Sequence, residues 1–254
     1  MVHEYEHLDV SRDGDVLTVA LDSPGELNPI TQQTYRELVD FWPYADHESD
    51  AKVIVLTGAG ESFSAGGNIE WMQEEYEDPA QFRETIQLSE LNMTHMAKLR
   101  TPMIARINGD CIGGSLGIAL HADVLVATSD ALFGDPHVDL NLGMASTPML
   151  MPLGMSFYKA KELMLTGDTI SADEAREEGL LNYVVERAEL DEKVDELAEK
   201  IASKPSPATG YIKRTVNGHV EAAHEKMLSV GLAREAISQQ HEDHRRAVES
   251  FLDE

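Results

Sequence analysis

The chain alternates between short apolar runs and longer stretches with helical spacing. The continuous apolar run of residues 52–57 is typical of a buried parallel strand, and residues 103–107 and 123–128 predict further strands. Helical spacing predicts helices over residues 31–49 and 79–99. Because the predicted strands alternate with helices, the pattern favours an α/β core.

The two ends of the chain depart from this alternation. Residues 5–11 and 16–21 predict two strands joined by an Asp-Gly turn. From about Leu190 onward the pattern predicts three helices, with enough apolar positions to pack on the core or on another subunit. We therefore divide the chain into a core over residues 1–190 and a C-terminal helical region over residues 191–254.

Two glycine pairs follow predicted strands. Gly113-Gly114 lies between the strand of residues 103–107 and a helix-like apolar run, and Gly66-Gly67 lies some forty residues upstream. Glycine tolerates positive φ and allows close approach of a ligand. The start of a helix presents free backbone N–H groups and the positive end of its dipole. We predict that these turns bind an oxyanion; the alternative is that the glycines only make tight turns.

Composition excludes several classes of partner. The 254 residues include 46 acidic and 20 basic ones, and the formal net charge of −26 disfavours binding to nucleic acid or anionic membranes. The single Cys111 cannot form an internal disulfide and is expected to be a small buried residue. The acidic start of the chain lacks the features of a signal peptide, so we expect a cytoplasmic protein. The scattered acidic residues suggest an organism that lives in high salt.

A series of motifs resembles the enoyl-CoA hydratase/isomerase (crotonase) family. In chain order they are Leu21–Thr31, Phe63–Ile69, Ile107–Gly109 with Gly113-Gly114, Ala131–Pro136, Leu165–Asp168, Ile170–Ala175 and Gly179–Val185. Each motif is weak alone, but the ordered set covers nearly the whole chain. The resemblance implies a spiral of ββα units, a C-terminal helical extension that mediates trimers or hexamers, and an acyl-CoA thioester as the ligand.

The same resemblance implies which residues form the site. It places the two amides of an oxyanion hole on Gly67 and Gly114, where they would polarise a thioester carbonyl and stabilise an enolate. We expect the substrate to be bound by Leu27, Ala65, Asn68, Gly113 and Asp135. Asn68 has an alternative role as the cap of the helix that follows it. No metal is expected, and coenzyme A is expected only as part of the substrate.

The chain departs from the family where proton chemistry is concerned. Family hydratases commonly use two glutamates, whose positions here are occupied by Gly117 and His137. His137 is the remaining candidate acid–base residue, because its ordinary pKa of about 6.5 suits proton transfer near neutrality. Asp135 and Asp139 are near enough in sequence to orient it. One base can shift a proton along an enolate or activate water; the alternative is a structural histidine held by a carboxylate of the turn.

Other functions remain open at this point. The missing glutamates favour a family member that binds acyl-CoA without catalysis, or a hydrolase that cleaves the thioester. Gly113–Gly117 also fits the nucleophile elbow of serine hydrolases, with Ser115 as the nucleophile. His241 and His244 are spaced as metal ligands on a helix, but a solvated helix end is the expected reading. Glu26 and Glu70 stand where many family members carry lysines, which leaves Lys213 and Arg214 as candidates for the phosphates of CoA.

Overall fold

Two sheets form the core of the chain. The computed structural model describes residues 4–25, 27–47 and 49–252. The larger sheet has the order β1-β2-β3-β4-β6-β9, and its strands are β1 (Leu8–Asp13), β2 (Val16–Leu21), β3 (Val53–Gly58), β4 (Met103–Ile107), β6 (Val124–Thr128) and β9 (Tyr183–Val185). Only β1 and β2 are antiparallel in it. The smaller sheet joins β5 (Cys111–Ile112), β7 (Leu132–Gly134) and β8 (Thr169–Ser171).

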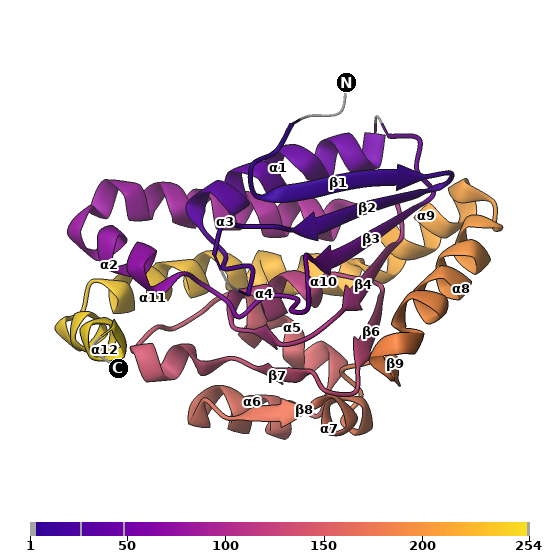
Figure 1. Cartoon of the computed structure of the whole chain (residues 1–254). Helices are drawn as coiled ribbons and strands as arrows, with labels where there is room; N and C mark the ends of the chain where they lie inside the picture. Colours follow the sequence, from indigo (N-terminus) through magenta and orange to yellow (C-terminus); the bar gives the residue numbers. More distant parts are fainter. Residues whose placement is uncertain (1–3, 26, 48, 253–254) are drawn as a thin grey trace.

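Helices follow most of the strands and continue to the C-terminal end (Figure 1). Those of the first part are α1 (Gln32–His47), α2 (Ile69–Glu77), α3 (Pro79–Lys98), α4 (Gly114–Ala119), the 3-10 helix η1 (Pro136–Leu140), α5 (Ser146–Gly154), α6 (Phe157–Thr166) and α7 (Ala172–Glu177). After the 3-10 helix η2 (Arg187–Glu189) come α8 (Leu190–Ala202), α9 (Ser206–Val216), α10 (Gly218–Ala223), the π-helix η3 (His224–Leu228), α11 (Ser229–Gln239) and α12 (Glu242–Leu252). No helix among the residues described is long and apolar enough to cross a membrane.

Both faces of the larger sheet are buried at its central strands β3, β4 and β6, as their apolar sequences require. All of β3 is buried; Val53 and Val55 pack with α8 on one face, while Ile54 and Leu56 belong to the main core on the other. The α/β architecture predicted from periodicity is confirmed. Helix α8 packs on the sheet itself although it begins at the expected boundary, and the division of the chain at residue 190 stays a prediction.

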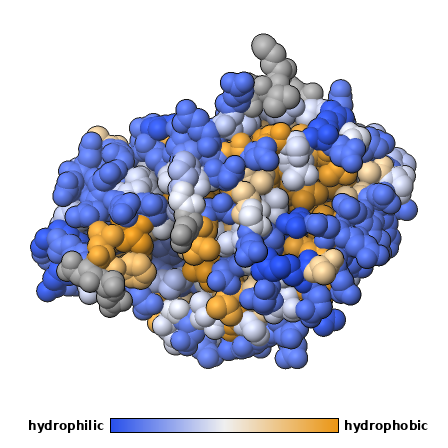
Figure 2. All heavy atoms as spheres, in the orientation of Figure 1, coloured by the Kyte–Doolittle hydropathy of each residue, from blue (hydrophilic) through white to orange (hydrophobic). Residues whose placement is uncertain are grey.

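The C-terminal helices bring distant segments of the chain to one end of the molecule. Helix α12 packs against α2 and η1, and α11 packs against α3 (Figure 1). Hydrophilic residues cover most of the face shown in Figure 2, and apolar residues gather in patches, one of them at the end where α2 and α12 lie. The prediction of three C-terminal helices missed the break near Gln240, which separates α12 from α11 and turns it back toward α2.

Candidate active site

The two glycine turns lie against each other. A parallel bridge joins Ser64 to Cys111, and the Ile112 N–H donates to the Ser64 carbonyl at 3.1 Å. Gly66 has a φ of 97°, and a Cβ atom there would lie 2.9 Å from the Ile112 carbonyl oxygen. Because no side chain fits between the two backbones, the first Gly-Gly turn is held directly on the second.

This contact leaves two backbone N–H groups available. Asn68 N–H donates to the Ile30 carbonyl at 3.1 Å and Ile30 N–H donates to Gly66 at 2.8 Å, so these bonds flank Gly67 without using its N–H. Gly114 is the first residue of α4, where an N–H has no partner within the helix. No backbone hydrogen bond found in the described ranges uses either N–H. The residues expected to form an oxyanion hole are therefore brought together by the fold.

Two cavities meet at this point. An open groove of about 570 Å³ runs past Leu27, Ala65, Asn68 and Gly113, four of the five expected substrate-binding residues. A smaller and less open cavity of about 50 Å³, which we name the enclosed cavity, adjoins the groove and is lined in part by Gly114.

The two cavities share the three lining residues Gly67, Met72 and His137. Asp135, the fifth expected binding residue, lines neither cavity and lies behind His137. Asn68 also caps α2, because its Oδ1 accepts from the Trp71 N–H at 2.7 Å, which confirms the capping alternative.

His137 is held by a buried carboxylate. Its Nδ1 bonds to Asp135, whose other oxygen accepts from the Thr147 hydroxyl. Burial alone lowers the pKa of His137, but the charge and hydrogen bond of Asp135 outweigh it and raise the pKa above its ordinary value. Burial likewise raises the pKa of Asp135, and its contacts with His137 reverse this to a net lowering. The pair therefore favours imidazolium beside carboxylate, as a general base needs once it has taken a proton.

Gly117 leaves no room for the family's carboxylate. A Cβ atom at Gly117 would lie 2.2 Å from Oγ and 2.7 Å from Cβ of Ser146. The Ser146 side chain thus fills the space that a glutamate would need. The predicted absence of a proton donor at this position is explained by packing as well as by residue type.

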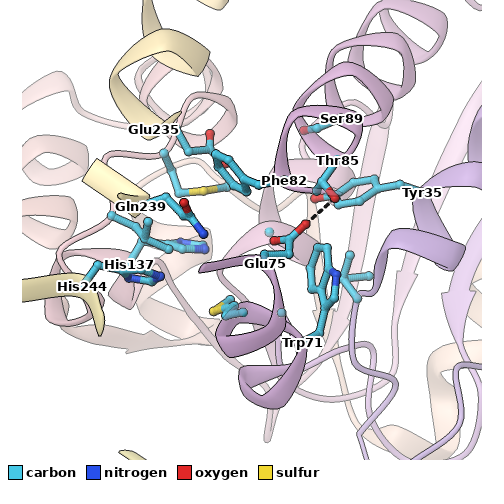
Figure 3. Close-up of a pocket in the computed structure, with 16 residues that line it drawn as sticks. Tyr35, Trp71, Glu75, Phe82, Thr85, Ser89, His137, Glu235, Gln239 and His244 are labelled. Carbon is cyan, nitrogen blue, oxygen red and sulfur yellow. Dashed lines mark hydrogen bonds between the residues drawn. The ribbon is translucent and has the colours of Figure 1, made fainter. Parts of the chain in front are cut away.

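Two other carboxyl groups line the enclosed cavity, and the sequence analysis missed both. Glu75 lies on α2, and Glu235 lies on α11 (Figure 3). Burial raises the pKa of Glu75 to about 7; the hydrogen bond from Thr85 lowers it, and the charge of Glu235 raises it further. Burial also raises the pKa of Glu235 to about 7, with His137 lowering it and Asp135 raising it.

A signal for both glutamates exists in the sequence. Glu75 lies four residues after Trp71, and Glu235 lies three residues after the buried Leu232, so each glutamate interrupts the apolar stripe of its helix.

Further polar groups of the cavity wall have no partner. Gln239 is 2% exposed, and neither its Oε1 nor its Nε2 forms a hydrogen bond. His244 is fully buried; its Nδ1 bonds to the Leu140 carbonyl at 2.6 Å, while its Nε2 is unpartnered. Burial lowers the pKa of His244, so the ring is neutral near pH 7. The reading of His244 as part of a solvated helix end was wrong, because α12 folds back and buries it.

Two minor expectations, on Ser115 and Cys111, are settled by their surroundings. Ser115 is fully buried and bonds to the carbonyls of Ser64 and Ile112, at 2.9 and 2.8 Å, so its hydroxyl serves the turn and is no exposed nucleophile. Burial raises the pKa of the Cys111 thiol, as expected of a buried residue.

The candidate cations for the CoA phosphates are already paired. Lys213 is 5% exposed, and its Nζ lies 2.7 Å from an oxygen of Asp123. Arg214 pairs with Glu221 at 2.8 Å. Lys213 as a phosphate ligand was therefore wrong, because that ammonium is buried in an ion pair; Glu26 lies outside the residues described. Within the described ranges, no group of three or more His, Cys, Asp or Glu is placed to hold a metal ion.

Comparison with known proteins identifies the family of the chain. The family model described as enoyl-CoA hydratase/isomerase matches residues 11–254. The short-chain-enoyl-CoA hydratase of Clostridium acetobutylicum is 32% identical over 98% of this chain and 96% of its own length. The crotonyl-CoA hydratase of Syntrophomonas wolfei is 28% identical over 98% of this chain and 96% of its own length.

Solved structures agree as well. An enoyl-CoA hydratase/isomerase from Mycobacterium paratuberculosis superposes with a TM-score of 0.92 at 32% identity, covering 96% of this chain and 98% of that one. The chain belongs to the enoyl-CoA hydratase/isomerase family and has the crotonase fold. It is an enzyme of the type that acts on acyl-CoA thioesters.

Proposed function

We propose that the enzyme moves a proton along the acyl chain of a short acyl-CoA, with His137 as the general base. The observation that carries this proposal is the junction of the two cavities, where Gly67 and His137 face the same point. A thioester carbonyl at the junction would place coenzyme A in the groove and the acyl group in the enclosed cavity. The carbon next to the carbonyl would then lie beside His137.

The size of the enclosed cavity supports a short acyl group. Its volume is about 50 Å³. One water-sized group needs about 10–15 Å³ on this measure, so the cavity accepts roughly three to five non-hydrogen atoms. A four-carbon acyl group places three carbons beyond the carbonyl and fits this space.

The proton transfer follows from the contacts of His137. Nε2 removes a proton from the carbon next to the thioester, and the electron pair moves onto the carbonyl oxygen to give an enolate. The N–H groups of Gly67 and Gly114 stabilise that oxygen; one such donor is worth about 10²–10³ in rate. Asp135 stabilises the imidazolium formed. In a 3-enoyl-CoA, whose double bond joins the third and fourth carbons, return of the proton to the fourth carbon moves the double bond to the second and third carbons.

Hydration of a short 2-enoyl-CoA is the second candidate. It is favoured by Glu75 and Glu235, because carboxyl groups with a pKa of about 7 can accept or donate a proton near neutrality. In that reaction water adds to the third carbon and the enolate collects a proton at the second. Both candidates share the enolate and its oxyanion hole.

Isotope exchange tests the shared step and separates the two reactions. Vinylacetyl-CoA and crotonyl-CoA are incubated in D₂O at molar KCl and analysed by mass spectrometry. We expect vinylacetyl-CoA to become crotonyl-CoA with deuterium incorporation, and a gain of water would indicate hydration.

The His137→Ala variant should lose about 10²–10⁴ in rate and still bind acyl-CoA. The His95→Ala variant, a partly buried histidine on α3, serves as the control. Exchange by His137→Ala within threefold of wild type would remove His137 from the mechanism.

The assembly and setting of the enzyme are also proposals. We infer a homotrimer or hexamer, supported by exposed apolar side chains on α6 and α9, namely Phe157, Tyr158, Leu165, Tyr211, Ile212 and Val216. Light scattering at molar KCl tests the mass, and Ile212→Asp should weaken assembly. We further infer a cytoplasmic enzyme that needs no cofactor besides the CoA of its substrate, so activity should survive dialysis against a chelator.

A further inference from the structure

Part of the lining of the enclosed cavity is polar, and we define this polar wall as Trp71, Glu75, Glu235, Gln239 and His244. Each of two helices presents a pair of these residues four positions apart, Trp71 with Glu75 on α2 and Glu235 with Gln239 on α11. Residues at this spacing share one face of a helix. Figure 3 shows Gln239 and Glu75 pointing into the cavity from opposite sides. Both helices therefore direct polar side chains at one space.

The hydrogen-bonding capacity of this wall is largely unused. Both amide atoms of Gln239, Nε2 of His244 and Nε1 of Trp71 are buried without a partner. Buried polar groups are nearly always hydrogen-bonded, because leaving one unpaired is costly. A hydrocarbon chain in the cavity would leave all of these atoms unpaired. An oxygen on the acyl group would give them a partner.

The charges of the wall decide what kind of oxygen fits. Glu75 and Glu235 face the cavity, and its described lining includes no Lys or Arg. The other titratable groups on the lining are His137, already paired with Asp135, His244 and Tyr35. Above pH 7, where both glutamates have lost their protons, they would repel a second carboxylate on the ligand. A neutral hydroxyl can donate to a carboxylate and accept from the Gln239 amide.

We propose that the acyl group of the substrate carries a neutral oxygen at its far end, a hydroxyl in the first place, which binds between Gln239 and the two glutamates. The proposal rests on the proposed function in one respect, the placing of the acyl group in the enclosed cavity. The three groups line the enclosed cavity and not the groove, so they face the acyl group and not coenzyme A. The preferred substrate class is thus a short ω-hydroxyacyl-CoA or its unsaturated form.

A matched pair of ligands tests the preference by binding alone. Isothermal titration calorimetry compares 4-hydroxybutyryl-CoA with pentanoyl-CoA, in which a methyl group replaces the hydroxyl. A site built to bond a hydroxyl rejects the apolar analogue strongly, and we expect binding at least about thirtyfold tighter for the hydroxy compound. Succinyl-CoA should bind more weakly than either. Equal affinities for the first two ligands would overturn the proposal.

Two variants assign the preference to the wall. Gln239→Leu should bring the affinity ratio to within about threefold of unity, because it removes the amide and keeps the volume. Gln87→Leu, at an exposed position of α3, should leave the ratio unchanged and serves as the control. Glu75→Gln should relieve the exclusion of succinyl-CoA. A ratio that persists in Gln239→Leu would contradict the assignment to this residue, and the wild-type ratio does not depend on how the variant folds.

The outcome separates this proposal from the proposed function. Deuterium exchange without a preference for the hydroxy ligand would overturn the polar acyl site and leave the role of His137 as the base intact. A preference without exchange would keep the polar site and remove the proposed reaction.

Discussion

The two walls of the enclosed cavity are built in different ways. One wall is backbone: Gly67 and Gly114 come from turns that touch through main-chain atoms. A Cβ atom on Gly66 would lie 2.9 Å from the Ile112 carbonyl oxygen. The other wall is side chain: its carboxyl, amide and imidazole groups come from α2, α11 and α12. The backbone wall offers the same two donors in any protein with these turns. The side-chain wall differs with every residue that the helices present.

The two walls therefore differ in how readily a substitution changes them. An N–H in a tight turn cannot be lost by substitution, except to proline, so the stabilisation of an oxyanion resists change. The polar wall, in contrast, is altered by a single replacement at Gln239 or Glu235. In the proposed mechanism, the enolate step belongs to the backbone wall and the choice of acyl group belongs to the helices.

The largest expected effect comes from removing one donor of the backbone wall. Gly114→Pro deletes the N–H at the first position of α4, where proline is tolerated. We expect kcat to fall by about 10²–10³ while the melting temperature stays within a few degrees. Gly114→Ala keeps the N–H and places its Cβ 3.5 Å from the Tyr35 hydroxyl, an ordinary contact, so it is the control. Similar rates for the two variants would place the oxyanion elsewhere.

The backbone wall and the core behind it were largely predictable from the sequence. The strand expected over residues 103–107 has the same bounds as β4, because a buried parallel strand reads as an apolar run. Glycine pairs after such strands indicate tight turns, since few other residues adopt positive φ. His137 was predicted from its place in the chain, and the fold adds its bond to Asp135.

The side-chain wall was not predictable in the same way. Glu75 and Glu235 are separated by 160 positions in the chain, and nothing in either helix tells which face the other will cover. In so acidic a chain, a glutamate on a helix is most often solvated, which hid both residues. His244 was hidden for a further reason. The turn at Gln240 folds α12 back so that His244 lines the cavity, and the sequence pattern did not predict this turn.

The second prediction concerns the space beside Gly117. Gly117→Ala should destabilise the enzyme by about 1–3 kcal/mol, because the new Cβ collides with Ser146. Adding Ser146→Gly should recover most of this loss, since the next atom is Cγ2 of Thr147 at 3.9 Å. Urea unfolding of both single variants and the double variant gives the coupling. Additive effects would show that Ser146 does not fill this space.

The third prediction uses the raised pKa of the two glutamates. Between about pH 4.5 and pH 7 the folded chain holds protons on Glu75 and Glu235 that the unfolded chain has lost. Folding stability therefore falls as pH rises through this window. Glu75→Gln should flatten the fall when unfolding free energies are measured at pH 5 and pH 7. The raised pKa of His137 adds a loss of the same sign above its unfolded value, and it is common to both proteins. An unchanged slope in the variant would contradict the pKa of Glu75.

The smallest expected effect is that of salt, which should act on the acidic surface and not on the cavity. Molar KCl screens the repulsion of a chain with a net charge of −26, so the melting temperature should rise by about 2–4 °C for each kcal/mol gained. Buried carboxyls are screened much less. The affinity ratio of 4-hydroxybutyryl-CoA to pentanoyl-CoA should therefore stay constant across the same salt range. A melting temperature that is flat from low to molar KCl would count against the acidic surface as a salt adaptation.

The cap of α2 connects the two walls, because Gly67 precedes the cap and Glu75 lies on the capped helix. Asn68 fixes the first turn of α2 directly after Gly67, and Glu75 lies seven residues further along the helix. At a rise of about 1.5 Å per residue, the segment from Asn68 to Glu75 is roughly 10 Å long. A tilt of about 10° of this segment about the cap would move its far end by about 2 Å. A displacement of the Asn68 cap would therefore move the Gly67 N–H and the Glu75 carboxyl together, because both are attached to the two ends of this short segment.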